Sequence, residues 1–254
     1  MTRFLCSNDD GVLAAGLACL QQAAEPLGEV YVVAPDREQS ATSHSLTLHH
    51  PLRPRQLGVR RWQVDGTPTD CVMLAVEALM PHRPDFVLSG VNHGPNMGED
   101  VLYSGTVAAA MEGLALGVPS IAISFAGRQG AGSASDFDSH VEPLSALLSH
   151  LISLPSLPRD TLLNVNLPPI PADQVRGVKL TRLGRRVFSD SVVQREDPWG
   201  KPIYWIGGGS VTWSAGEGTD VEAVRAGYIS VTPLHLDITH HARLGDAAHW
   251  WKTP

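Results

Sequence analysis

The first two thirds of the chain alternate short apolar runs with segments that carry apolar residues at helical spacing. The apolar runs end at turn-forming residues, which is typical of buried strands. We expect strands at residues 3–7, 29–34, 59–64, 85–89, 120–125 and 162–166, and helices at 14–24, from Thr67-Pro68 onward, at 106–116 and at 138–151. Strands that alternate with helices predict an α/β fold, with a mostly parallel sheet covered by helices on both faces.

The chain after about residue 169 follows a different, turn-rich pattern. Strand-like runs at 187–194 and 203–206 flank the sequence REDPWGKP and predict a long β-hairpin that contains Trp199, Tyr204 and Trp205. An isolated hairpin is marginally stable in water, so we expect this arm (about 187–206) to pack on another subunit. The alternative is an arm folded back on its own domain. The pattern therefore divides the chain into a domain at 1–170 and a smaller C-terminal part at 171–254, which continues with a helix at 219–226 and a strand at 228–232.

The composition of the 254 residues, 43% hydrophobic and 18% charged, is ordinary for a globular protein. A net charge of −7 gives no basic excess with which to bind a nucleic-acid duplex. No run approaches the roughly 18 apolar residues of a membrane span, and the N-terminus fits no signal peptide. Cys6, Cys19 and Cys71 match no zinc or disulfide spacing. We expect reduced packing cysteines in a cytoplasmic protein with no membrane partner.

Three polar loops follow three of the predicted strands, at residues 7–11, 34–46 and 90–106. In a parallel sheet the carboxyl ends of the strands lie at one edge, and ligands bind there. Two of the loops are longer than the usual two to six residues of such connections. The sequence therefore predicts that the three loops converge on one ligand site.

Two adjacent carboxylates, Asp9 and Asp10, follow the first strand in the sequence SNDDG. Two carboxylates held at one place need a cation, or one of them must take up a proton. The polar side chains of the other two loops carry mostly oxygens, which suit Mg²⁺ or Mn²⁺; they are Ser40, Thr42, Ser43, Asn92 and Asn96. Gly11 would let the backbone turn away so that both carboxylates face one ion. The alternative is that one of the aspartates only caps the following helix.

The segment that ends in Ser104, Gly105 and Thr106 leads directly into a predicted helix. The unpaired N–H groups and the dipole of a helix start attract anions, and the two hydroxyls would add donors. The alternative is an ordinary capped helix. No Walker motif, GxGxxG or GxSxG occurs, which argues against a P-loop and an acyl-transfer hydrolase. We expect Glu99 and Asp100 to form a solvated face of the third loop, and His44 either to act as an acid or to order the second loop.

The motifs SNDDG, APDREQSATSHSLT, GTPTDCV, SGVNHGPNMGEDVLYSGTVAAAMEG, LLNVNLP and ISVTPLHLD occur in this order. Together they resemble the SurE (survival protein E) family of 5'/3'-nucleotidases over nearly the whole chain. The resemblance implies a Rossmann-like catalytic domain and a C-terminal hairpin used in homodimers or homotetramers. It also implies a phosphatase that depends on one divalent cation, Mg²⁺ or Mn²⁺, per subunit. The substrates would be nucleoside 5'- and 3'-monophosphates, with short polyphosphate as a side substrate.

The resemblance also assigns roles to residues. The metal ligands of the family fall on Asp9, Asp10, Ser40 and Asn92. The phosphate-side residues fall on Asn96 and on Ser104, Gly105 and Thr106. The resemblance leaves open the roles of His44 and His93. It also leaves open which nucleobase is preferred and which carboxylate acts as the general base.

Two other mechanisms start from an acidic pair after the first strand. A phosphorylated receiver domain needs an Asp after the third strand and a Lys after the fifth; Asp65 is a poor match for the first, and residues 124–127 supply no Lys. A phosphatase with Asp10 as a covalent nucleophile is the other alternative. The adjacent Asp-Asp pair lacks the intervening residue usual in such enzymes, which argues against this alternative. Trapping of a phospho-enzyme would distinguish it from direct attack by a water molecule.

Overall fold

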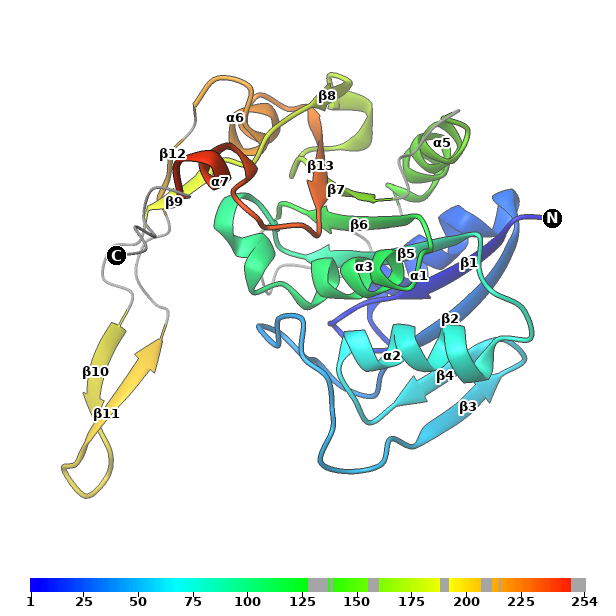
Figure 1. Ribbon diagram of the computed structural model, residues 1–254, viewed down its shortest axis with the longest axis horizontal. Coiled ribbons are helices and arrows are strands. Elements are labelled where there is room, and N and C mark those ends of the chain that lie inside the picture. Colours follow the sequence, from blue (N-terminus) through cyan, green and yellow to red (C-terminus); the bar gives the residue numbers. More distant parts are fainter. Residues whose placement is uncertain are drawn as a thin grey trace, which may run out of the picture.

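A central nine-stranded sheet dominates the computed structural model, which describes residues 1–127, 137, 139–154, 160–187, 192–206, 212–214 and 216–247 (Figure 1). The strand order is β3-β4-β2-β1-β5-β6-β7-β13-β8. The strands are β1 (Arg3–Ser7), β2 (Glu29–Pro35), β3 (Pro54–Gly58), β4 (Arg61–Val64), β5 (Phe86–His93), β6 (Ser120–Phe125), β7 (Thr161–Leu167), β8 (Val178–Leu180) and β13 (Ile229–His235). The six strands from β4 to β7 pair in parallel, while β3 and β13 run antiparallel to β4 and β7. The predicted α/β fold with a mostly parallel sheet is confirmed.

Helices cover both faces of the sheet (Figure 1). Helices α1 (Ala15–Ala24) and α5 (Val141–Ile152) pack on one face, and α2 (Pro68–Leu74) and α3 (Gly105–Ala115) pack on the other. A π-helical stretch, Ala75–Leu79, continues α2. Phe4 and Cys6 lie in the core beneath α1, whereas Leu5 between them lies in the core beneath α2. Two covered faces explain why the strands are uniformly apolar rather than alternating.

Local sequence signals place several elements. Thr67 caps α2 in a capping box: its hydroxyl accepts a hydrogen bond from the Asp70 N–H, and the Asp70 carboxylate accepts one from the Thr67 N–H. The structure confirms this predicted cap, and it buries Cys6, Cys19 and Cys71 as expected. Strand β3 was not predicted, because all five of its residues are exposed and no apolar face marks it. The predicted helix at 138–151 is α5, and residue 138 lies outside the described residues.

The C-terminal part contributes β8 and β13 to the central sheet. Its other elements are β9 (Arg185–Val187), β10 (Val192–Glu196), β11 (Pro202–Ile206), β12 (Thr212–Ser214), α6 (Asp220–Arg225), α7 (His241–Ala247) and a 3₁₀ turn (Ala172–Gln174). The predicted helix at 219–226 is α6, capped by Thr219. The division of the chain at residue 170 stays a prediction.

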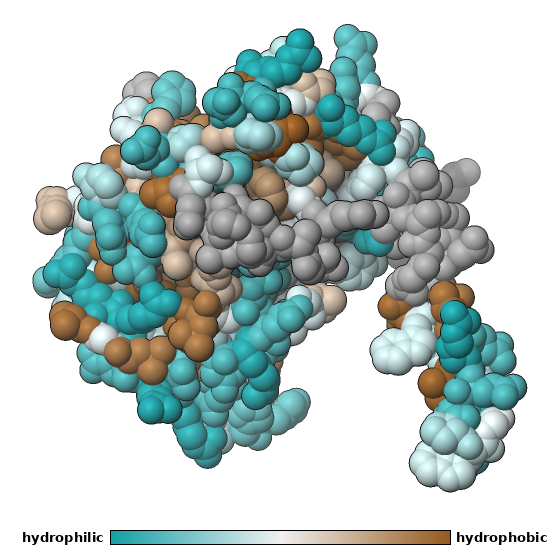
Figure 2. All heavy atoms as spheres, turned by 180° about the vertical axis from the view of Figure 1, so that it is seen from behind, coloured by the Kyte–Doolittle hydropathy of each residue, from teal (hydrophilic) through white to brown (hydrophobic). Residues whose placement is uncertain are grey.

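The predicted hairpin is formed by β10 and β11, which project from the rest of the molecule (Figure 1). Val187 does not belong to it, because β9 pairs with β12 at the base of the arm. Residues 188–191 of the predicted arm lie outside the described residues. Seen from behind, the arm stands clear of the body and carries hydrophobic side chains (Figure 2). Trp199 is 83% exposed and Ile206 is 91% exposed.

None of the helices in the described ranges is long and apolar enough to cross a membrane.

Candidate active site

The three polar loops meet at the carboxyl ends of the adjacent strands β2, β1 and β5. The Gln39 N–H of the second loop donates to the Asp9 carbonyl of the first loop at 2.7 Å. The His93 N–H at the end of β5 donates to Asp10 Oδ2 at 3.2 Å. The Ser43 hydroxyl donates to the Leu102 carbonyl at 2.7 Å and so joins the second loop to the third. The predicted convergence is confirmed.

The site lies where the order of the strands reverses. After β1 the chain continues to β2 and β4 on one side, and later returns to β5, β6 and β7 on the other side. Helix α1, which follows β1, and helix α3, which follows β5, therefore pack on opposite faces of the sheet. Such a switch point leaves a crevice between the two adjacent loops, where α/β proteins bind their ligands.

The first loop does not cap the following helix. Helix α1 begins at Ala15 after Ala14, and no side chain accepts a hydrogen bond from its first turn. Gly11 has a φ of +101°, and a Cβ at this position would lie 3.2 Å from the carbonyl carbon of Arg37. The capping alternative for Asp9 and Asp10 is therefore wrong, and the predicted turn at Gly11 is confirmed.

The Asp9 carboxylate is buried against the start of α3. It accepts a hydrogen bond from the Thr106 hydroxyl. Any Cβ at Gly105 would lie 2.7 Å from the Cβ of Asp9, so only glycine permits this approach. Burial raises the pKa of Asp9 to about 6, the charge of Asp10 raises it as well, and the hydrogen bond from Thr106 opposes them. The site holds a carboxylate whose charge is poorly stabilised by the protein alone.

Asp10 is less buried and faces His93. Its Oδ2 atom lies 3.4 Å from His93 Nδ1, in addition to the hydrogen bond from the His93 N–H. In the part of the chain that the structure describes, no Lys or Arg forms an ion pair with Asp9 or Asp10. Two adjacent carboxylates that no Lys or Arg neutralises fit a site for a divalent cation.

The remaining predicted ligands are an amide and a hydroxyl. The Asn92 Nδ2 atom donates to the Gly94 carbonyl at 2.9 Å, which leaves its Oδ1 atom as an available ligand. Ser40 is exposed and donates to Glu38 at 2.6 Å, one residue beyond the Gln39 that binds Asp9. Across the described ranges no three His, Cys, Asp or Glu side chains gather as a metal cluster. A cation here would therefore need amide and hydroxyl oxygens beside the two carboxylates, a donor set that suits Mg²⁺ or Mn²⁺.

The start of α3 is capped, which is one of the two interpretations given to it. The Ser104 hydroxyl accepts a hydrogen bond from the Val107 N–H at 3.0 Å and so caps the helix. The Thr106 hydroxyl is used by Asp9 rather than left as a donor for an anion. Anion binding by this helix start stays a prediction.

Asn96 is held by strands β6 and β7. Its Nδ2 atom donates to Ser124 Oγ at 2.8 Å, and its backbone is bound by the side chains of Asn164 and Asn166. No function was predicted for either asparagine. The signal that marks them is a pair of amides, two residues apart, inside the otherwise apolar run Leu162–Leu167 of the strand.

The third loop is also attached to the C-terminal part. Glu99 accepts a hydrogen bond from the Arg186 N–H, and Asp100 forms an ion pair with the Arg186 side chain. The expected solvated face at Glu99 and Asp100 is therefore wrong, because β9 covers it. The buried Asp220 accepts hydrogen bonds from the N–H groups of Gly98 at 2.9 Å and Gly184 at 2.7 Å.

His44 ties the second loop to α3. Its Nε2 atom lies 2.9 Å from a carboxylate oxygen of the buried Glu112. Of the two interpretations of His44, this geometry fits the ordering role.

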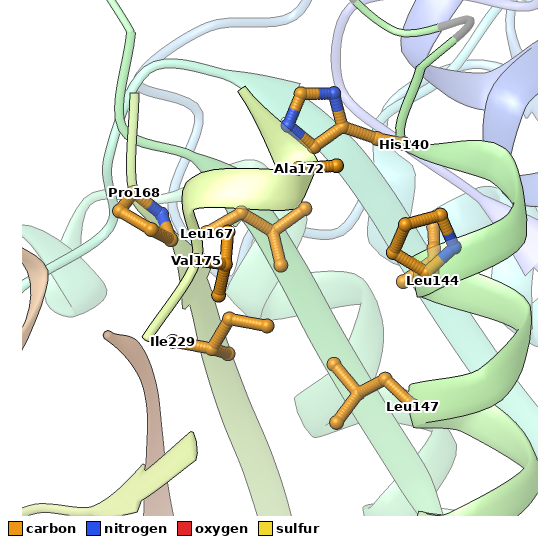
Figure 3. Close-up of a pocket in the computed structure, with 9 residues that line it drawn as sticks. His140, Leu144, Leu147, Leu167, Pro168, Ala172, Val175 and Ile229 are labelled. Carbon is orange, nitrogen blue, oxygen red and sulfur yellow. The ribbon is translucent and has the colours of Figure 1, made fainter. Parts of the chain in front are cut away.

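A separate pocket of about 200 Å³ opens between α5 and the chain that follows β7 (Figure 3). Leu144 and Leu147 of α5 face Leu167, Val175 and Ile229 across it. Its lining contains no carboxylate, so it offers none of the chemistry gathered at the edge of the sheet.

The fold and the site define a Rossmann-like α/β protein with two adjacent carboxylates at the switch point of its sheet. The family model described as survival protein SurE matches residues 4–190. The chain belongs to the SurE family.

Proteins similar along the whole chain support this assignment. The 5'-nucleotidase SurE of Gemmatimonas aurantiaca is 68% identical over 99% of this chain and 100% of the relative. The 5'-nucleotidase SurE of Geotalea uraniireducens is 47% identical over 98% of each chain. A crystal structure of the SurE protein from Aquifex aeolicus is 44% identical, covers 98% of this chain and 99% of that one, and superposes with a TM-score of 0.86.

Proposed function

We propose that the chain is a divalent-metal-dependent phosphatase that hydrolyses nucleoside 5'-monophosphates, and 3'-monophosphates, to nucleoside and phosphate. The observation that carries the proposal is the pair Asp9 and Asp10, which lies beside the start of α3 and has no Lys or Arg ion-pair partner among the described residues. The similar proteins from G. aurantiaca and G. uraniireducens, both named 5'-nucleotidase SurE, support the substrate class.

The proposed ligands of one Mg²⁺ or Mn²⁺ ion are Asp9, Asp10, Asn92 and Ser40. A bound cation would neutralise phosphate oxygens and make a water molecule a stronger nucleophile at neutral pH. The chain prepares these ligands before any ion binds. Thr106 orients Asp9, the His93 N–H orients Asp10, and the hydrogen bond to Gly94 orients Asn92.

The other residues act on the substrate. One of the two carboxylates accepts the proton of the attacking water. The Asn96 amide keeps a second N–H beyond the one that it gives to Ser124, and we propose that it donates this hydrogen to the phosphoryl group. The α3 dipole at Ser104 to Thr106 favours the negative charge on the phosphoryl group as it passes from the nucleoside oxygen to water.

The family resemblance also supports short polyphosphate as a side substrate and a homodimer or homotetramer in the cytoplasm. The exposed side chains of β10 and β11 support the assembly, because a lone hairpin with exposed aromatic residues gains stability by packing on a second chain.

Phosphate release from a panel of 5'- and 3'-nucleoside monophosphates, measured on the purified protein, tests the proposal. We expect turnover that EDTA abolishes and that added MnCl₂ or MgCl₂ restores. Full turnover after the metal is stripped would remove the cation from the mechanism, and no release from any monophosphate would overturn the proposed function. A phosphorylated protein trapped during turnover would favour the covalent alternative at Asp10.

A further inference from the structure

Strand β7 carries two asparagines within its run of apolar residues, Leu162 to Leu167. Asn164 and Asn166 are both 0% exposed, and they lie two residues apart on one face of the strand. A buried amide is costly unless its polar atoms are hydrogen-bonded. Valine or isoleucine would form the strand without this cost. The two amides therefore indicate a role other than formation of the sheet.

The two asparagines bind one residue of the third loop. Asn166 Oδ1 accepts a hydrogen bond from the Asn96 N–H at 2.9 Å, and Asn166 Nδ2 donates to the Asn96 carbonyl at 3.1 Å. Asn164 Nδ2 donates to the same carbonyl at 2.8 Å. Both backbone polar groups of Asn96 are therefore held by side chains of a strand 68 to 70 residues further along the chain.

The side chain of Asn96 is fixed as well. Its Nδ2 atom donates to Ser124 Oγ on β6 at 2.8 Å, which sets the plane of the amide. Backbone and side chain are thus positioned by two strands of the rigid sheet, although Asn96 itself lies in the long loop between β5 and α3.

This arrangement has an uncompensated cost. Among the described residues the Asn164 Oδ1 atom is buried with no hydrogen-bond partner. Leaving a buried acceptor unpaired lowers the stability of the fold. The chain retains this polar cluster beside the candidate site, where a packing role alone would favour an apolar residue.

We infer that Asn166, supported by Asn164, is a positioning residue that sets Asn96 for phosphoryl transfer. The inference rests on the proposed function, since it acts through the Asn96 amide and not on the substrate. Electrostatic stabilisation of a transition state requires a donor that is already in place, so a loosened Asn96 lowers kcat more than it changes KM.

The variants Asn166→Asp and Asn166→Leu test this positioning. Aspartate still accepts the hydrogen bond from the Asn96 N–H but places an oxygen against the Asn96 carbonyl, and leucine removes both hydrogen bonds at similar volume. A displacement of the order of 1 Å costs roughly 100-fold in rate, so we expect kcat to fall by about 30- to 100-fold, with KM changed by less than about threefold. Asn166→Leu keeps the test open if the buried charge of Asn166→Asp prevents folding.

A matched control is Ser120→Ala at the opposite end of β6. It too removes a buried side-chain hydrogen bond, the one from Ser120 Oγ to the Val118 carbonyl at 2.9 Å, but at the end of β6 away from the loops. We expect a lower melting temperature and an unchanged kcat for this control. A melting temperature that falls equally in all three variants, with kcat unchanged, would reduce Asn166 to a structural role.

Double substitution separates positioning from general damage. In an Asn96→Ala background there is no amide left to position, so Asn166→Leu should lower kcat by no more than about twofold further. If the full loss of rate recurs in that background, the inference is wrong. If the wild-type protein is active and Asn166→Leu has the same kcat, only this inference is overturned. If the wild-type protein is inactive, the proposed function is overturned as well.

Discussion

The carboxyl edge of the sheet and the projecting arm differ in how their side chains find partners. At the edge, polar groups from residues far apart in sequence bind one another, as Asp9 with Thr106 and Asn96 with Asn166. Along the arm, β10 and β11 pair with each other while Trp199, Trp205 and Ile206 stay exposed. The candidate site is organised by contacts within one chain, whereas the arm presents a surface that one chain leaves uncovered.

The two regions are connected at the base of the arm. Strand β9 ends at Val187 shortly before the arm, and its Arg186 binds Glu99 and Asp100 of the third loop. Asp220 adds a second link through its hydrogen bonds from Gly98 and Gly184. We therefore expect substitutions in the two regions to have different effects. Those at the edge of the sheet should change turnover, those in the arm should change assembly, and those at the base of the arm should change both weakly.

The largest effect is expected at the edge. Asp10→Asn removes one carboxylate of the pair while leaving an oxygen for the His93 N–H, and we expect kcat to fall by about 100- to 1,000-fold in saturating Mn²⁺. The melting temperature in EDTA should stay unchanged or rise, because the repulsion between two adjacent carboxylates is relieved.

Asp173→Asn is the matched control for this change, since it removes an exposed carboxylate from the 3₁₀ turn that follows β7. Its kcat should equal that of the wild type. Normal turnover by Asp10→Asn would remove Asp10 from the proposed mechanism and leave the edge with no demonstrated chemistry.

In the arm we expect a loss of assembly. The combined change Tyr204→Ser, Trp205→Ser and Ile206→Ser replaces three exposed side chains of β11 and should weaken self-association by more than about tenfold, measured as molar mass by light scattering. Val59→Ser, which replaces an 87% exposed side chain on the body, is the control and should leave the molar mass unchanged. If the arm variant has the wild-type molar mass at all concentrations, the arm does not mediate assembly, and the alternative that it packs on its own chain is favoured.

The sequence was sufficient for the elements that are covered on both faces. Strand β6 occupies residues 120–125 as predicted, because a short apolar run bounded by turns is typical of a buried strand in a chain that alternates strands and helices. The edge strands β3 and β8 were missed because their residues are exposed and carry no periodic signal. The antiparallel direction of β13 was not predicted either, since direction depends on the path of the connection and not on the residues of the strand.

The candidate site divides in the same way. Asp9 and Asp10 could be placed because they directly follow a strand, and the ends of parallel strands share an edge. Asn166 and Asp220 could not, because their contacts with Asn96 and Gly98 span 70 and 122 residues and are set by tertiary packing. The sequence indicates which residues could act at the site, and the structure shows which residues distant in sequence position them.

The smallest effect is expected at the base of the arm. Burial raises the pKa of Asp220 above its usual range, although three backbone N–H groups, those of Gly98, Gly184 and Val221, donate to it. Asp220→Asn turns one acceptor into a donor that faces these groups, at a cost of about 1–3 kcal/mol. For a chain of this size that corresponds to a melting temperature lower by about 2–12 °C, measured by calorimetry. Since Gly98 lies two residues beyond Asn96, we also expect kcat to fall by less than about tenfold.

Asp173→Asn again serves as the control. A lower melting temperature with kcat and molar mass both unchanged would show that the edge and the arm are independent, and that the contacts of Asp220 only stabilise the fold.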